Sequence, residues 1–266
     1  MGAGGNGWLV ATGGDLAVLT AIRGALAFLT RLPVGGDEAA WNAFRATPAA
    51  FVVAGYVVGG VAALPFLAPL PVPTAVAGYV AALYLLTGVT HADGLADCGD
   101  AAAAHGPATE RREALKDSAT GVGGALALGA TLVALALGGL GVAGAGPRVA
   151  VRLALAAEVS AKVGMATLAA LGDPGHEGLG SAVVGDLSAA ALLPVVAVAA
   201  PAALAAPAGS TPALGATLLA GPVAALLVGR WATATLGGVT GDALGAANEL
   251  GRVVALHAGV VVWTLW

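Results

Sequence analysis

Long apolar runs with very few charged residues are the feature that most restricts what this chain can fold into. Hydrophobic residues make up 58% of its 266 residues and charged residues only 10%, with a mean hydropathy of +0.90. Soluble domains carry roughly 25% charged residues, and an apolar run of about 18 residues is typical of a membrane-spanning helix. We therefore expect an all-α fold, a polytopic integral membrane helical bundle with about seven transmembrane helices.

The apolar runs give the approximate positions of these spans. The expected spans are 47–69, 73–91, 120–144, 148–171, 188–207, 212–236 and 251–266. A segment at 15–33 contains Arg23 and Arg31, which favours an interfacial N-terminal helix over a full crossing. Gly55 and Gly59 are four residues apart in the first span, a spacing that lets helix backbones approach closely in lipid. Barrel strands are excluded because the runs lack alternating polar positions.

Charge and cysteine content exclude several classes of protein. The net charge is −4 and there is no basic cluster, so a nucleic-acid partner is not expected. Cys98 is the single cysteine, which rules out an intramolecular disulfide, and no zinc-ligand spacing surrounds it.

The distribution of basic residues predicts which loops face the cytoplasm. Three arginines precede the first expected span and three basic residues lie in the 92–119 loop, whereas Arg148 lies at the mouth of a span on the opposite side. By the positive-inside rule, the loops 92–119, 172–187 and 237–250 share the cytoplasmic face. These loops hold most of the acidic residues, so we expect a reaction surface on this face of a cell-membrane protein.

The strongest candidate site is the stretch THADGLADCGDAA at 90–102. On a helix, Asp93, Asp97 and Asp100 project from one face. Three like charges disfavour ionisation of one another, and Mg²⁺, which prefers carboxylate and phosphate oxygens, relieves that conflict. A solvated acidic surface is the alternative, but ionisable residues beside a membrane span are usually functional. We predict that these aspartates bind Mg²⁺, with His91 beside them.

Two further polar stretches lie on the same expected face. Lys116, Asp117 and Ser118 precede a glycine-rich helix start, where free backbone N–H groups and a lysine suit a phosphate; simple helix capping by Ser118 is the alternative. In GGVTGDALGAANEL at 237–250, glycines beside Asp242 allow a close approach to a ligand, and Asn248 follows; the alternative is a glycine-rich turn. Within a span, Glu158 and Lys162 are expected to neutralise each other as i, i+4 partners.

Together these stretches resemble the cobalamin synthase family, the adenosylcobinamide-GDP ribazoletransferases. The resemblance is carried by FLTRLPV at 28–34, HADGLADCGDA at 91–101, LKDSATGVGGALAL at 115–128, EGLG at 177–180 and GGVTGDALGAANEL at 237–250. It implies one membrane-embedded domain over 1–266 that joins adenosylcobinamide-GDP to α-ribazole or α-ribazole 5′-phosphate, releasing GMP with Mg²⁺ as cofactor. It leaves a homo-oligomer open.

The resemblance also suggests roles for individual residues. The attack is expected from the ribose 5′-hydroxyl on the pyrophosphate. Asp93, Asp97 and Asp100 would hold Mg²⁺, with His91, Lys116 and Asp117 in catalysis and Ser118, Asp242 and Asn248 in binding. Two positions depart from the family pattern: Arg252 replaces an expected acid and Lys162 an expected arginine.

Two other functions compete with this interpretation. A CDP-alcohol phosphotransferase also uses clustered aspartates, but its pattern requires arginine after the alanine, where this chain has Asp97 after Ala96. A transporter would place polar residues at the midplane of several broken spans, whereas the acids here gather in loops on one side.

Overall fold

The computed structural model describes residues 13–115, 119–175, 180–185, 187–204 and 210–266, and every element in these ranges is helical. The elements are α1 (Gly13–Leu29), α2 (Glu38–Arg45), α3 (Ala49–Ala62), η1 (Leu64–Leu67), α4 (Val72–Thr87), α5 (Thr90–Ala103), α6 (Ala108–Ala114), α7 (Val122–Gly144), α8 (Pro147–Leu171), η2 (Ser181–Val183), η3 (Ala189–Ala191), α9 (Leu192–Ala199), α10 (Pro201–Leu204), α11 (Thr211–Leu236) and α12 (Gly241–Leu265). The predicted all-α class is confirmed.

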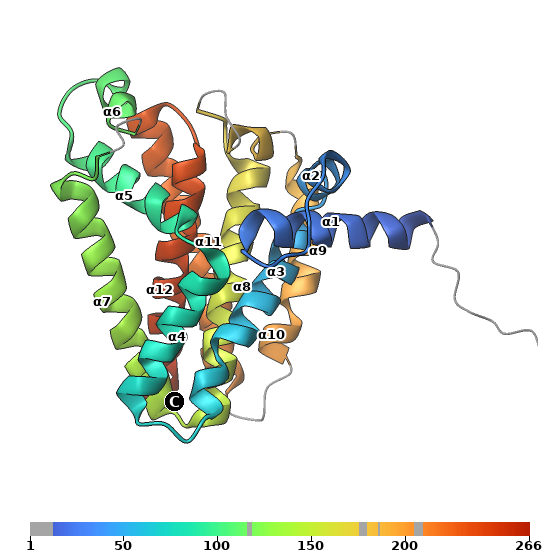
Figure 1. Cartoon of the computed structure of the whole chain (residues 1–266), viewed down its shortest axis with the longest axis vertical. Coiled ribbons are helices and arrows are strands. Elements are labelled where there is room, and N and C mark those ends of the chain that lie inside the picture. Colours follow the sequence, from blue (N-terminus) through green and yellow to red (C-terminus); the bar gives the residue numbers. More distant parts are fainter. Residues whose placement is uncertain (1–12, 116–118, 176–179, 186, 205–209) are drawn as a thin grey trace, which may run out of the picture.

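Helix α8 is the central element of the bundle. It packs against α3, α11 and α12, and its side chains are almost all buried over its C-terminal two thirds. The long helices α7, α8, α11 and α12 run along the long axis of the molecule (Figure 1). Their connections place the end of α8, the end of α11 and the start of α12 at the same end of the bundle (Figure 1).

The number of spanning helices differs from the sequence expectation. Among the described residues, α7, α8 and α11 are long and apolar enough to cross a membrane, and up to five spans result if the bent pairs α2–α3 and α4–α5 each count as one. The segment expected at 188–207 is split into η3, α9 and α10, each too short to cross alone. Helix α12 begins at Gly241, ten residues before the span expected at 251–266, and its first half carries charged residues.

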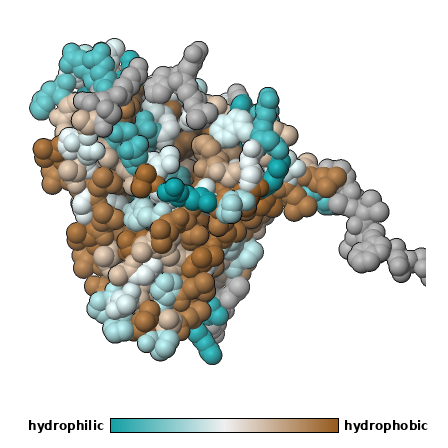
Figure 2. All heavy atoms as spheres, in the orientation of Figure 1, coloured by the Kyte–Doolittle hydropathy of each residue, from teal (hydrophilic) through white to brown (hydrophobic). Residues whose placement is uncertain are grey.

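The surface of the bundle fits lipid contact along its length. Large apolar side chains point outward on α7 and α11, among them Val122, Leu126, Leu219 and Leu227, which are 64–77% exposed. Figure 2 shows most of the hydrophilic residues toward the upper end, a mainly hydrophobic surface below them, and a smaller hydrophilic group at the lowest end. Exposed apolar area of this extent marks a membrane or partner surface. The chain is a polytopic helical membrane protein.

Small residues allow the helices to pack closely, as predicted for Gly55 and Gly59. A Cβ on Gly59 would lie 2.9 Å from Cβ of Glu158, and one on Gly55 would lie 3.0 Å from Cγ of Lys162. Helix α3 therefore lies directly against the charged part of α8. Side chains larger than hydrogen at these positions would separate the two helices.

Ser160 of α8 compensates for a proline in the neighbouring helix. Pro222 lies inside α11 and has no N–H to donate to the carbonyl of Leu218, four residues earlier. The Ser160 hydroxyl donates to that carbonyl at 2.9 Å and accepts from the N–H of Gly221 at 2.8 Å. The backbone groups freed by the proline are thus satisfied within the protein, as the hydrocarbon region requires.

Two helices lie across the bundle instead of along it. Helix α1 extends sideways from the body (Figure 1) and exposes Leu16, Leu19 and Phe28; its location at the membrane interface stays a prediction. Helices α4 and α5 meet at 94°. Gly88 ends α4 with φ +70°, a conformation that favours glycine. The chain therefore turns sharply, and α5 lies across the end of the bundle.

Candidate functional site

Helix α5 presents carboxylates on one face and apolar side chains on the other. Leu95, Cys98 and Ala102 line an apolar groove of about 450 Å³ shared with α7, α11 and α12. Asp93 and Asp97 lie on the opposite side of the helix, since 3.6 residues per turn separates the two sets, and Asp93 is exposed. Asp93 and Asp97 therefore lie together on the face of α5 opposite this groove, as predicted.

Close backbone packing fixes α5 against the start of α12. A Cβ on Gly94 would lie 2.7 Å from Cα of Asp242, and one on Gly245 would lie 2.9 Å from the carbonyl oxygen of His91. Helix α12 starts after Thr240, whose side chain accepts a hydrogen bond from the N–H of Ala243. Asp242 thus lies in the first turn of α12, in a helix and not in the glycine-rich turn considered as the alternative.

Asp97 is the carboxylate most affected by its surroundings. Its pKa is raised from 3.8 to about 6, mainly by burial. Three negative charges add to this effect, in decreasing order Asp242, Asp93 and Asp100. Carboxylates from α5 and α12 therefore share one electrostatic environment, although they are about 145 residues apart in the sequence.

Asp100 has a structural partner at the start of α7. One of its carboxylate oxygens accepts from the N–H of Gly121 at 2.7 Å, and the other accepts from the N–H of Gly124 at 2.8 Å. A carboxylate in this position satisfies free N–H groups and interacts favourably with the helix dipole. Asp100 therefore anchors α7 to α5, a role that its spacing from Asp97 did not indicate.

The donor chemistry of the acidic surface suits Mg²⁺, but the described side chains do not form a closed binding cluster. Within the described ranges, no group of three or more His, Cys, Asp or Glu side chains comes together closely enough to hold a metal ion. Mg²⁺ commonly uses only one or two protein carboxylates and completes its coordination with water and substrate phosphates. An open site of this kind would need only one or two of Asp93, Asp97 and Asp242.

The three loops that were expected on one face meet at this end of the bundle. The N–H of Gly175 donates to the carbonyl of Val239 at 2.9 Å, and the N–H of Val239 donates to the carbonyl of Asp173 at 2.8 Å. Arg112 donates to the carbonyl of Leu236 at 2.8 Å. The predicted Lys116, Asp117 and Ser118 lie outside the described residues.

A buried ionic network lies beneath the acidic surface. Arg252 of α12 donates to Glu158 of α8 at 2.5 Å and to Glu249 at 2.7 Å. Lys162 lies 3.1 Å from Glu158, so the predicted i, i+4 pair is confirmed. Two acids and two bases, all at most 1% exposed, thus balance one another.

Asn248 and His91 extend this network to α5. Asn248, predicted as a binding residue, is fully buried. Its side chain contacts Lys162 at 2.5 Å, Glu249 at 3.0 Å and the Nδ1 atom of His91 at 3.2 Å. Tyr84 of α4 also donates to Glu249 at 3.0 Å. The two departures from the family pattern, Lys162 and Arg252, therefore lie in the same network.

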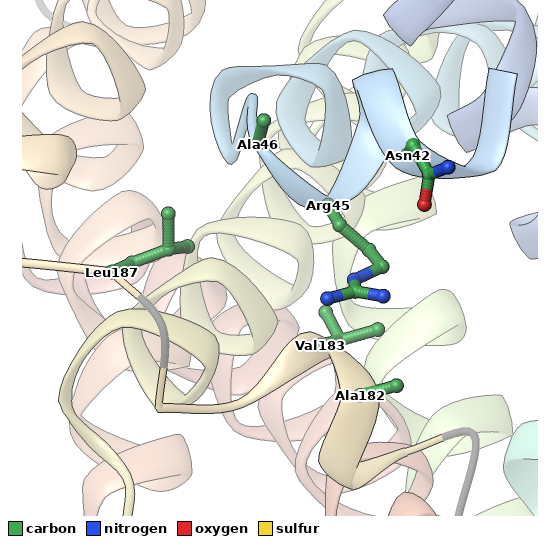
Figure 3. A pocket seen from close by; sticks show the side chains of 6 residues that line it. All are labelled: Asn42, Arg45, Ala46, Ala182, Val183 and Leu187. Carbon is green, nitrogen blue, oxygen red and sulfur yellow. The ribbon is translucent and has the colours of Figure 1, made fainter. Parts of the chain in front are cut away.

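Arg45 marks a cavity that the sequence did not indicate. The cavity has a volume of about 270 Å³ and lies between α2 and the residues Ala182, Val183 and Leu187. Figure 3 shows the guanidinium of Arg45 extending from α2 toward Val183, with Asn42 on the same helix. Arg45 is one of the three arginines before the first expected span, and a lone arginine in a sequence has no pattern that reveals a cavity.

The fold and the site define a polytopic helical membrane protein with a carboxylate-rich surface at one end. The chain belongs to the cobalamin-5-phosphate synthase family, whose model matches residues 21–260. This confirms the resemblance drawn from the motifs.

Relatives match along nearly their whole length. The chain is 54% identical to an adenosylcobinamide-GDP ribazoletransferase of Halorubrum lacusprofundi, over 93% of this chain and 99% of that protein. It is 48% identical to one of Haloquadratum walsbyi (93% and 100%) and 36% identical to one of Methanocella arvoryzae (92% and 97%). No solved structure matches the chain. The relatives carry the name of a transferase, so this is a family of enzymes.

Proposed function

We propose that this protein transfers the corrinoid phosphate of adenosylcobinamide-GDP to α-ribazole or α-ribazole 5′-phosphate, releasing GMP, in the assembly of cobalamin. The observation that carries the proposal is the carboxylate set of Asp93, Asp97 and Asp242 at the polar end of the bundle. Relatives bearing the transferase name match 93% of the chain, which supports the same reaction.

The balance of atoms restricts which hydroxyl attacks. The new bond joins an acceptor oxygen to the phosphorus that stays with the corrinoid, the phosphoanhydride bond breaks, GMP leaves and the hydroxyl proton is released. In α-ribazole 5′-phosphate the 5′-oxygen is already esterified. An acceptor group common to both substrates must therefore be a secondary ribose hydroxyl, which replaces the 5′-hydroxyl expected from the resemblance.

Mg²⁺ fits this chemistry as the cofactor. When bound, the ion would neutralise charge on the pyrophosphate and orient it for in-line displacement. Asp97, with Asp93 and Asp242 beside it, would hold the ion, because burial and the neighbouring carboxylates both raise the pKa of its carboxyl and a bound cation would offset both effects. Asp100 would support this set by fixing α7 to α5 through its two backbone contacts.

Cations at the same end would help to bind the anionic substrate. Arg45 extends into its cavity (Figure 3), where a guanidinium suits phosphate oxygens. Lys116, in the segment before α7, is proposed to steady the leaving phosphate, with Asp117 and Ser118 beside it. The polar end is proposed to face the cytoplasm and the apolar surface to contact the bilayer, so that water-soluble substrates reach the site without crossing the membrane.

The proposal is tested with purified protein in detergent. Adenosylcobinamide-GDP is incubated with either acceptor, with Mg²⁺ or with EDTA, and both GMP and the corrinoid product are measured by mass spectrometry. We expect Mg²⁺-dependent GMP release together with a corrinoid whose mass includes the acceptor. GMP without that product would indicate hydrolysis, and no GMP with either acceptor in Mg²⁺ would contradict the proposed reaction.

A further inference from the structure

The orientation of the Asn248 side-chain amide is fixed by two neighbours with opposite requirements. The Lys162 ammonium can only donate hydrogen bonds, so the amide oxygen faces it at 2.5 Å. The Glu249 carboxylate, bonded also by Arg252 and Tyr84, accepts, so the amide nitrogen faces it at 3.0 Å. If the amide were flipped, its NH₂ group would face the Lys162 ammonium, which also donates, and its oxygen would face the Glu249 carboxylate, which also accepts.

This orientation determines the protonation state of His91. The Asn248 amide nitrogen carries two hydrogens, one directed to Glu249 and the other to Nδ1 of His91 at 3.2 Å. Nδ1 must therefore hold a lone pair. An imidazolium or an Nδ1–H tautomer would place two donors against each other, so the ring is neutral with its proton on Nε2.

The position of His91 leaves its Nε2 proton available for a hydrogen bond to a further partner. His91 lies in the first turn of α5, two residues before Asp93, and its backbone packs on Gly245 of α12. Among the described residues, none forms a hydrogen bond with Nε2. The described part of the chain therefore holds the ring through Nδ1 and leaves the Nε2–H group for another partner.

We propose that Lys162 and Asn248 are positioning residues that hold His91 as the Nε2–H tautomer, so that His91 donates a hydrogen bond to an anionic oxygen of the substrate. In this state Nε2 cannot accept a proton, so the catalytic role that the resemblance suggests for His91 would be that of a hydrogen-bond donor and not of a general base. The tautomer itself follows from the buried network alone, whereas the contact with substrate rests on the proposed function.

The first test reads the tautomer directly and needs no activity. Protein labelled with ¹⁵N-histidine is studied by NMR in detergent, where protonated and unprotonated ring nitrogens have well-separated shifts. The His91 signals are identified by their loss in His91→Gln. If that variant does not fold, a variant with His105, His176 and His257 replaced by glutamine leaves only His91. We expect Nδ1 unprotonated and Nε2 protonated; a proton on Nδ1 would overturn the proposal.

Asn248→Asp tests the relay from Lys162. The new carboxylate only accepts, so it requires a proton on Nδ1, and we expect that proton to appear in the spectrum. An unchanged tautomer in folded Asn248→Asp would overturn the positioning role. A purely structural asparagine would not move this proton.

The donor role is tested with two matched variants of His91. A glutamine amide lies near the position of Nε2 and an asparagine amide near that of Nδ1, so only His91→Gln retains the donor. If removal of the donor costs about 100-fold in kcat, as for other hydrogen bonds to developing charge, His91→Gln will be at least about tenfold more active than His91→Asn. Equal loss in both folded variants would overturn the donor role. Failure of the wild-type protein to release GMP would contradict the proposed function and leave the tautomer result intact.

Discussion

At the scale of single residues, Asp97 is the carboxylate whose ionised form the site disfavours most clearly. Burial and three neighbouring carboxylates raise its pKa to about 6. Its charge therefore destabilises the folded protein at neutral pH, a cost that a bound cation would offset. Residues retained at such a cost are commonly functional.

The stability of Asp97→Asn should reveal this cost. Because the folded-state pKa lies above the unfolded value of 3.8, the folded protein holds more protons between about pH 4 and pH 6, and its free energy of unfolding falls as pH rises through that window. In EDTA, Asp97→Asn should raise Tm by about 1–3 °C at about pH 7.5, allowing for the partial exposure of the group. The gain should vanish near about pH 4. A lower Tm for the variant in EDTA at neutral pH would contradict this account.

Arg252 is the base that pairs with both carboxylates of the buried network, Glu158 and Glu249. Arg252→Gln leaves Glu158 with Lys162 alone and removes the ionic partner of Glu249, so we expect a destabilisation of about 3–5 kcal/mol. Arg230→Gln, an exposed arginine on α11, is the matched control and should change stability by less than about 0.5 kcal/mol. Thermal unfolding in detergent compares the two. Similar Tm values would show that the network contributes little.

Sequence spacing predicted only the local part of this network. Glu158 and Lys162 are one turn apart on a single helix, so their pairing was predictable. Arg252 and Asn248 join them from α12, and such contacts depend on how α8 and α12 pack. For the same reason the resemblance placed Asn248 among the binding residues, whereas the structure buries its side chain among Lys162, Glu249 and His91.

At the scale of elements, the acidic surface depends on how closely α5 lies on α12. Gly94 and Gly245 remove the side chains that would separate the two helices. Gly88 directs α5 across the bundle at 94° to α4. The positions of Asp93 and Asp97 relative to Asp242 therefore follow from these glycines.

Gly94→Ala tests this packing. The added Cβ would lie 2.7 Å from Cα of Asp242, and because backbone cannot yield there, α5 must move. A displacement of about 1 Å should lower the rate of GMP release on the order of 100-fold. Gly129→Ala on α7, where nothing lies within 4 Å, should leave the rate unchanged. Full activity of Gly94→Ala would show that the close contact is not required.

The sequence predicted the apolar helices better than the polar ones. Runs such as 120–144 and 148–171 nearly match α7 and α8, because hydropathy and length suffice to locate them. The 92–119 stretch was treated as a loop between spans, apart from the helical spacing of its aspartates, yet it contains most of α5 and all of α6. Its glycines and aspartates obscure the helical pattern, and packing on α12 overrides their low helix propensity.

At the scale of the whole molecule, the two ends of the bundle differ in the charged residues that they carry. Arg111 and Arg112 lie at the acidic end, on α6. The opposite end has Arg148 and also Arg152, one turn further along α8. The excess of basic residues still favours a cytoplasmic location for the acidic end.

Cysteine labelling tests this orientation. In a Cys98→Ser background, Leu70→Cys lies in the exposed connection between η1 and α4, at the end opposite the acidic surface (Figure 1), and Glu113→Cys lies on α6. With a membrane-impermeant maleimide on intact cells, we expect Leu70→Cys to react and Glu113→Cys to react only after permeabilisation. The reverse pattern would place the acidic surface outside the cell.

The central claim, that the carboxylates of α5 and α12 form a metal-dependent active site, is tested most directly by GMP release from Asp97→Asn over a range of Mg²⁺ concentrations. Glu38→Gln, an exposed carboxylate on α2, serves as the control and should match the wild type. We predict a loss on the order of 100-fold for Asp97→Asn, with a higher Mg²⁺ requirement for the remaining activity. Wild-type activity of Asp97→Asn at limiting Mg²⁺ would contradict the claim.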